Sequence, residues 1–161
     1  MNRKIMAGIL SVIITGSFAL PVYGSSSSQQ DTTTLTATID SSYVLTIPMD
    51  TPVSYGTVDT DLSGTLKVTG NVRSSQQVTV SATTEKFKND DGQAEFTYML
   101  LDKSKDIPFS KGVWNEAELR SSQPKEIPLA IHIPQDTWNK AKAGTYKSTV
   151  TFTAELENVQ P

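Results

Sequence analysis

The chain has 161 residues, with 14 basic and 17 acidic side chains, a formal net charge of −3 and no cysteine. The acidic balance argues against nucleic acid, whose phosphates select a basic face, and against membrane attachment through clusters of basic residues. The missing cysteines exclude disulfides, a thiol nucleophile and thiolate metal ligands. The length suits one domain that is held together by core packing alone.

Residues 1–24 have the pattern of a secretory signal peptide. Arg3 and Lys4 form a basic start, residues 5–20 carry no charge, and Pro21 precedes compact residues after which we expect cleavage, following Gly24. The alternative is a retained membrane anchor, but a spanning helix needs about 20 apolar residues and this run is shorter. We therefore expect a secreted or cell-surface protein with no membrane segment after cleavage.

The rest of the chain changes character twice. Residues 25–34 are rich in Ser, Thr and Gln and contain no apolar side chain, which predicts a flexible leader. From residue 35 onward apolar side chains recur at every second position. The strand-like runs cover residues 35–39, 43–47, 65–72, 77–82, 95–101, 125–133 and 145–156. In the last run Val150, Phe152 and Ala154 alternate with threonines, a period that no helix produces.

This alternation predicts an all-β domain over residues 35–156. We expect a two-sheet antiparallel β-sandwich, Ig-like or pilin-like, with roughly seven to nine strands. One short connecting helix is predicted over residues 134–143, because Pro134 and Gly144 are start and stop signals. Residues 157–161 are expected to form a C-terminal tail.

The first strand-like run allows two interpretations. Leu35, Ala37 and Ile39 lie at period two behind the leader, which is how a strand donated to a neighbouring subunit would look. The same residues could instead pair within their own domain with residues 43–47, across a turn at residues 40–42. We expect the internal strand, because local pairing needs little loop closure.

Few residues could support catalysis. His132 is the one histidine, and its position between two isoleucines points it away from the core as a solvated strand residue. Glu116 and Glu118 would share a strand face about 6.6 Å apart, near the spacing of an inverting glycosidase. No further motif supports either group, so we expect no enzyme, no catalytic residue and no cofactor.

Two binding sites are weaker candidates. Asp90, Asp91 and Glu95 bunch carboxylates around Gly92 and could bind calcium, although Asp91 and Gly92 fit a hairpin turn better. We therefore predict no metal site. Trp114 follows a glycine and a loop, which makes it the best candidate for an exposed aromatic that contacts a ligand such as a sugar, although we favour a partly buried aromatic that closes the sandwich edge.

Both ends of the domain resemble known proteins. Residues 35–48 (LTATIDSSYVLTIP) resemble the opening of small exported β-sandwich modules of Gram-positive bacteria, and residues 143–153 (AGTYKSTVTFT) are similar to their closing strand, which also recurs in pilin-like and spore-coat-like sandwiches. The resemblance implies a surface or appendage module without family catalytic residues. The chain departs from usher-type pilins, since it lacks their cysteine pair.

These observations predict a structural or adhesive protein of the cell surface, which could be a subunit of a surface assembly. Its expected partners are proteins or glycans at that surface, including other copies of itself through strand addition. The alternative function is a carbohydrate-binding module that recognises cell-wall or host glycans.

Overall fold

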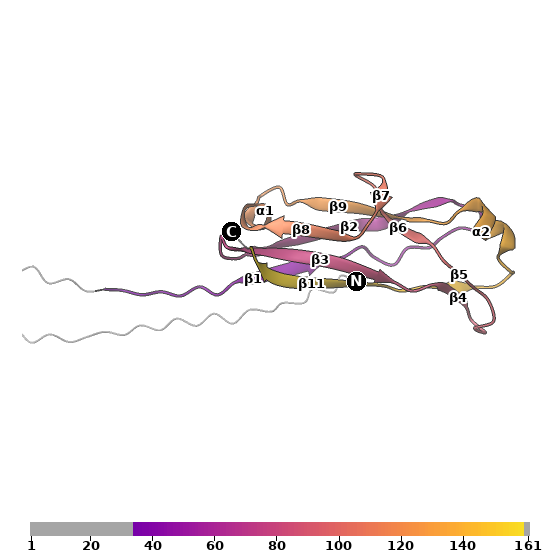
Figure 1. Cartoon of the computed structure of the whole chain (residues 1–161), viewed down its shortest axis with the longest axis horizontal. Coiled ribbons are helices and arrows are strands. Elements are labelled where there is room, and N and C mark those ends of the chain that lie inside the picture. The colour runs from indigo at the N-terminus through magenta and orange to yellow at the C-terminus, as the bar shows by residue number, and fades with distance from the viewer. Residues whose placement is uncertain (1–33, 160–161) are drawn as a thin grey trace, which may run out of the picture.

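The computed structural model describes residues 34–159, so the signal peptide expected over residues 1–24 and all but the last residue of the leader lie outside it. The described chain is mostly β-structure with antiparallel pairing (Figure 1). Its elements are β1 Ser42–Thr46, β2 Asp59–Asn71, β3 Gln76–Thr84, β4 Phe87–Asn89, β5 Glu95–Phe96, β6 Met99–Asp102, β7 Ile107–Pro108, β8 Lys111–Asn115, α1 Glu116–Arg120, β9 Glu126–His132, α2 Gln135–Lys140, β10 Tyr146–Lys147 and β11 Val150–Asn158.

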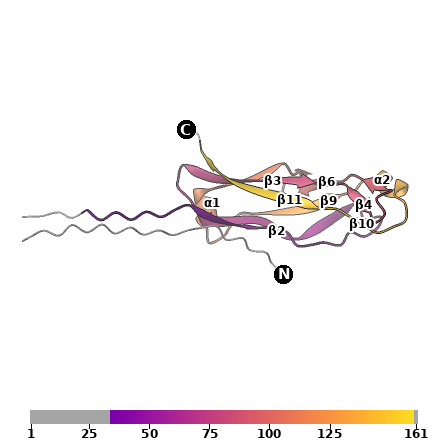
Figure 2. The ribbon, with the colours of Figure 1, turned by 90° about the horizontal axis from the view of Figure 1, so that it is seen from below.

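The strands form three sheets. One has five strands in the order β1-β2-β9-β6-β7, and the other two have three strands each, in the orders β11-β3-β8 and β10-β4-β5. All pairs are antiparallel. The body is elongated, with α1 at one end and α2 at the other, and both views agree on this placement (Figures 1 and 2).

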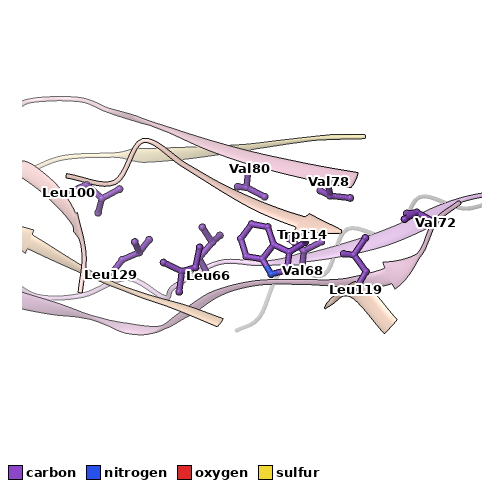
Figure 3. Packing of buried hydrophobic residues seen from close by; sticks show 10 residues of the cluster. Leu66, Val68, Val72, Val78, Val80, Leu100, Trp114, Leu119 and Leu129 are labelled. Atoms are coloured by element: carbon purple, nitrogen blue, oxygen red, sulfur yellow. The ribbon is translucent and has the colours of Figure 1, made fainter. Parts of the chain in front are cut away.

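The main core lies between the five-stranded sheet and the β11-β3-β8 sheet. Leu66 and Val68 of β2 face Val78 and Val80 of β3, and Trp114 of β8 fills the space between them (Figure 3). All five side chains are fully buried, because every second residue of each strand points to the same side. Burying one such side chain contributes about 1.5–3 kcal/mol. A second apolar cluster, formed by Phe87, Ile131, Ile133 and Trp138, lies at the α2 end.

The number of elements differs from the prediction. Eleven strands replace the expected seven to nine, three sheets replace two, and a second helix is present among the described residues. The three strands β5, β7 and β10 have two residues each, which is too short for alternation to be recognised. The second helix, α1, begins with a capping box in which the Asn115 side chain accepts from the Glu118 amide and Glu118 accepts from the Asn115 amide, both at 2.9 Å.

The expected internal strand over residues 35–39 is wrong. Residues 34–40 have no strand partner, and Leu35 and Ile39 are 82% and 64% exposed. The predicted turn at residues 40–42 does not form, because Ser42 already pairs with Asn71 as the first residue of β1. The chain before β1 therefore extends outward from the body at the end where α1 lies (Figures 1 and 2).

The predicted faces of the last strand are confirmed, but its inward face is less covered than expected. Val150, Phe152 and Ala154 are half-buried and alternate with exposed residues. Strand β11 also runs to Asn158, two residues into the expected tail. Because these inward side chains are only half-buried, the space beside β11 is not filled by other described residues.

Candidate functional site

The opening beside β11 is an apolar groove of about 970 Å³, within the size range of pockets that hold ligands. One wall is the irregular segment of residues 47–53 that follows β1. The other wall is residues 141–148 together with Val150 and Phe152 of β11. The floor consists of Leu62, Phe87, Phe96, Tyr98, Ile131 and Trp138.

The groove lies between two sheet edges that have no neighbour. Strand β1 ends the five-stranded sheet and β11 ends its own sheet. The Tyr43 hydroxyl of β1 donates a hydrogen bond to the Ala154 carbonyl of β11 at 3.1 Å, which places both edges on the same side of the molecule. On the opposite side the chain passes directly from β7 to β8 through two residues, and the Phe109 amide donates to the Leu100 carbonyl at 2.8 Å. The two sheets are therefore linked by a short chain connection on one side and by the Tyr43 side chain on the other.

Prolines explain why the first wall is not a strand. Pro48 and Pro52 lie in the segment after β1 and have no amide hydrogen to donate to a neighbouring strand. Only one isolated bridge forms there, in which the Met49 amide donates to the Ser63 carbonyl at 2.8 Å. The segment thus follows β2 without closing the gap to β10 and β11.

The floor is a packed aromatic cluster. The ring centre of Phe96 lies 5.1 Å from Phe87, 5.4 Å from Trp138 and 4.9 Å from Tyr146. Such contacts fix each ring relative to the others. The Trp138 indole N–H donates to the Thr57 carbonyl at 2.9 Å, so its polar atom is satisfied and its rings are left for apolar contact.

Two tyrosine hydroxyls in the groove are hydrogen-bonded within the chain. The Tyr98 and Ser148 hydroxyls are hydrogen-bonded at 2.9 Å, the Ser148 hydroxyl donates to the Glu85 carbonyl at 2.7 Å, and burial raises the pKa of Tyr98 above its ordinary 10.0. The Tyr146 hydroxyl donates to the Lys142 carbonyl at 3.0 Å. A neutral, aromatic surface of this kind suits an apolar ligand better than a charged one.

The rim of the groove exposes apolar side chains that the described residues leave uncovered. Ile47, Met49 and Tyr55 are 44%, 54% and 77% exposed. Lys142 and Lys147 line the same groove, and Lys147 pairs with Asp90 at 3.2 Å. An extended chain with apolar side chains on one face and polar ones on the other would match this combination of apolar floor and charged rim.

The possible ligand contact at Trp114 is wrong, and the residue is buried even more deeply than the favoured interpretation of an edge aromatic implied. Its side chain is completely buried in the main core, and its indole N–H donates to the Lys125 carbonyl at 3.0 Å. A Cβ atom on Gly112 would come within 2.6 Å of the Trp114 ring, so the glycine makes the room that the ring occupies. Gly112 and Trp114 share one face of β8, and this spacing of two was the signal for a strand that the prediction missed.

The three calcium candidates lie in a hairpin between β4 and β5, as the turn interpretation required. Asp91 accepts from the Gln93 amide at 3.0 Å, Gly92 has a φ of 71° and Asn89 accepts from the Ala94 amide at 2.8 Å. Glu95 bonds to Lys86 and Asp90 to Lys147. Among residues 34–159 no group of three or more His, Cys, Asp or Glu side chains is placed to hold a metal ion.

The structure also shows where the candidate catalytic residues lie and which side chains they contact. His132 is partly exposed and points away from the core, and its Nδ1 lies 2.6 Å from Asp59. Glu116 and Glu118 belong to α1 and not to a strand. Glu116 pairs with Arg120 at 2.9 Å, and Glu118 caps the helix and pairs with Lys125 at 3.0 Å. The strand spacing considered for a glycosidase pair therefore does not exist.

Sequence reasoning missed the groove itself. Its parts come from segments about 100 residues apart, and only the two prolines after β1 and the threonine-rich β11 gave a local sign of an open edge. Compared with known protein families, curated proteins and solved structures, the chain has no significant match. Within residues 34–159 no helix is both long and apolar enough to cross a membrane.

Proposed function

We propose that this chain is an exported structural or adhesive protein of the cell surface that binds a protein partner in its groove and performs no catalysis. The observation that carries this proposal is the apolar groove between two unpaired strand edges. Open edges offer backbone hydrogen bonds to an added strand, and an apolar floor beside them offers burial for every second side chain.

The architecture that we propose is a β-sandwich. Strands β3 and β4 are separated by two residues, as are β10 and β11, and β10 pairs with β4 just as β11 pairs with β3. The two three-stranded sheets then act as one long layer that faces the five-stranded sheet across the core. The resemblance of both ends of the domain to exported sandwich modules agrees with this arrangement.

Export is supported by the first 24 residues, which have the pattern of a secretory signal peptide. The non-catalytic role is supported by the state of the titratable groups. His132 is paired with Asp59, and the two glutamates of α1 are paired with Arg120 and Lys125. The charged side chains that line the groove, Asp50, Lys142 and Lys147, are exposed, and its floor is aromatic and aliphatic.

One observation favours carbohydrate binding as a second candidate. Tyr55 is 77% exposed and meets the Trp138 ring edge-on at 5.5 Å, so one flat aromatic face at the rim is free. Sugar rings stack on such faces through their C–H groups. In this case the rim, and not the strand edges, would determine what binds.

Binding to isolated cell envelopes separates the two candidates. We expect the chain from Ser25 onward to bind envelopes, and we expect prior protease digestion of the envelopes to abolish that binding while periodate oxidation of glycans leaves it unchanged. Met49→Asp in the groove should weaken the binding, whereas Met99→Asp, at a similarly exposed methionine outside the groove, should not. Periodate-sensitive binding that depends on Tyr55 would favour the glycan alternative, and failure to bind any envelope would contradict both.

A further inference from the structure

We propose that the groove receives residues 35–39 of a second copy of this chain, as a strand added to the free edge of β11. The inference rests on the proposed function, because it identifies the protein partner of the same groove. It joins two features of the fold: an exposed apolar segment before β1, and an apolar groove between residues 47–53 and the segment that leads into β11.

The segment has the side-chain pattern that the groove requires. Leu35, Ala37 and Ile39 lie on one face of an extended chain and Thr36 and Thr38 on the other. Leu35 and Ile39 are among the most exposed large apolar side chains of residues 34–159, and residues 34–40 have no strand partner. Their burial would remove a penalty that the isolated molecule carries.

The edge of β11 offers the matching backbone groups. The Ala154 carbonyl points to the free edge, since Tyr43 donates to it from β1, and the Thr149 carbonyl points the other way, since it accepts from Glu85 at 2.9 Å. Backbone groups of an antiparallel strand alternate between its two edges. The amide and carbonyl of Val150 and Phe152 therefore face the groove, where an added strand can pair with them.

The positions of the two features make the contact head-to-tail. The segment leaves the body at the α1 end, whereas the groove is floored by Trp138 of α2 at the opposite end (Figures 1 and 2). A segment and a groove at different ends form a heterologous contact, which propagates into a filament unless a ring closes. To fill its own groove, the segment would have to reverse at residues 40–41 and run back along β1.

The charges at the two sites are compatible. Asp40 is the only charged residue in residues 34–41, and it directly follows Ile39. Lys142 lies at the rim of the groove and is exposed. Asp50 also lines the groove and is exposed, so the rim carries both signs, and the apolar floor would meet only the uncharged side chains of residues 35–39.

Complementary variants test the inference in the whole chain from Ser25 onward. The donor variant is Leu35→Asp with Ile39→Asp, and its matched control, Thr36→Asp with Thr38→Asp, adds the same charge on the outward face. The acceptor variant is Met49→Asp. Its fold should persist because Met49 is 54% exposed and bonds to Ser63 through its backbone. Its control is Met99→Asp, 43% exposed and outside the groove. Unchanged circular dichroism melts verify all four folds.

Sedimentation equilibrium gives the expected result. The unaltered chain and both controls should form oligomers whose average mass rises with concentration to at least about twice the monomer mass. The donor and acceptor variants should each stay monomeric alone. Mixed, they should form a dimer and nothing larger, because one partner still accepts and the other still donates.

A synthetic peptide of residues 34–41 separates the remaining outcomes. By calorimetry it should bind the donor variant at least about tenfold more tightly than it binds the acceptor variant. An unaltered chain that remains monomeric while the donor variant binds the peptide would mean that the segment fills its own groove, which overturns the second-copy proposal. No peptide binding at all would overturn the groove assignment. In either case retained binding to cell envelopes would leave the proposed function standing.

Discussion

Trp114 shows how one residue organises the main core. It lies between β2, β3 and β9, its ring fits only because Gly112 has no side chain, and its N–H is satisfied by the Lys125 carbonyl. The Lys125 ammonium also lies 5.7 Å from the ring centre, a cation–π contact at the edge of the core. The residue therefore acts in folding and not in recognition.

Replacing Trp114 tests this role. Trp114→Ala should lower the free energy of unfolding by about 3–5 kcal/mol, because it removes a fully buried aromatic side chain and leaves a cavity. Tyr55→Ala, at an aromatic residue that is 77% exposed, should change it by less than about 1 kcal/mol. Urea unfolding measures both, and equal destabilisation by the two substitutions would contradict the burial of Trp114.

Asp102 is the one charged side chain that is buried among the described residues, with 3% of its surface exposed. Burial alone would raise the pKa of its carboxyl, but hydrogen bonds from the Ser104 hydroxyl, from Lys105 and from the Ser104 amide outweigh burial and lower the pKa below its ordinary 3.8. These bonds hold the turn between β6 and β7, in which Asp106 has a φ of 55°.

The lowered pKa predicts how stability depends on pH. The ionised carboxylate of Asp102 stabilises the fold above pH 3.8, and that contribution is lost as the pH falls through the lower pKa of the folded state. Asp102→Asn should be less stable than the unaltered chain at pH 7 and should lose less stability between pH 5 and about pH 2. Three exposed carboxyls with lowered pKa values, Glu95, Glu126 and Glu157, are common to both chains and cancel in the comparison. Parallel stability curves over this range would contradict the assignment.

At the scale of elements, the hairpin of β4 and β5 uses its carboxylates in its own structure. Glu95 pairs with Lys86, and this contact lowers the pKa of Glu95. Asp90, in the turn after β4, pairs with Lys147 of β10 at 3.2 Å, so the carboxylates of Asp90 and Glu95 are directed to different lysines.

We therefore expect millimolar calcium to leave the melting temperature unchanged. A ligand that binds only the folded state would raise that temperature by mass action. Differential scanning calorimetry with calcium, and then with a chelator, measures the effect. A rise of several degrees that the chelator reverses would show that Asp90, Asp91 and Glu95 bind the ion after all.

Long strands were predictable from the sequence, and short or tertiary features were not. The runs in β2, β3, β9 and β11 have enough residues for a period of two to be recognised, and their inward residues are those predicted. Strand β8 was missed because its inward pair is Gly112 and Trp114, of which only one is apolar. The unpaired state of residues 35–39 depends on where β1 begins its pairing with β2, and the groove depends on segments far apart in the chain. Neither the unpaired state of residues 35–39 nor the groove can be predicted from a local sequence pattern.

On the scale of the whole molecule, the fold is asymmetric in a way that a closed monomer does not require. The apolar segment of residues 35–39 is exposed at one end, and an apolar groove lies beside the free edge of β11. A long open edge is an aggregation hazard unless something covers it. The exposed segment at the opposite end supplies a cover that makes the association directional.

Disulfide trapping tests this central claim most directly, because the chain has no cysteine of its own. One chain carries Ala37→Cys in the segment, and a second carries Met49→Cys at the groove. Mixed under mild oxidation, they should yield a covalent heterodimer in good yield, since the two residues come together only when the segment of one copy lies in the groove of the other. Pairing Ala37→Cys with Ser75→Cys, at an exposed residue outside the groove, should yield little. Equal cross-linking at both sites, or none at Met49, would contradict the account.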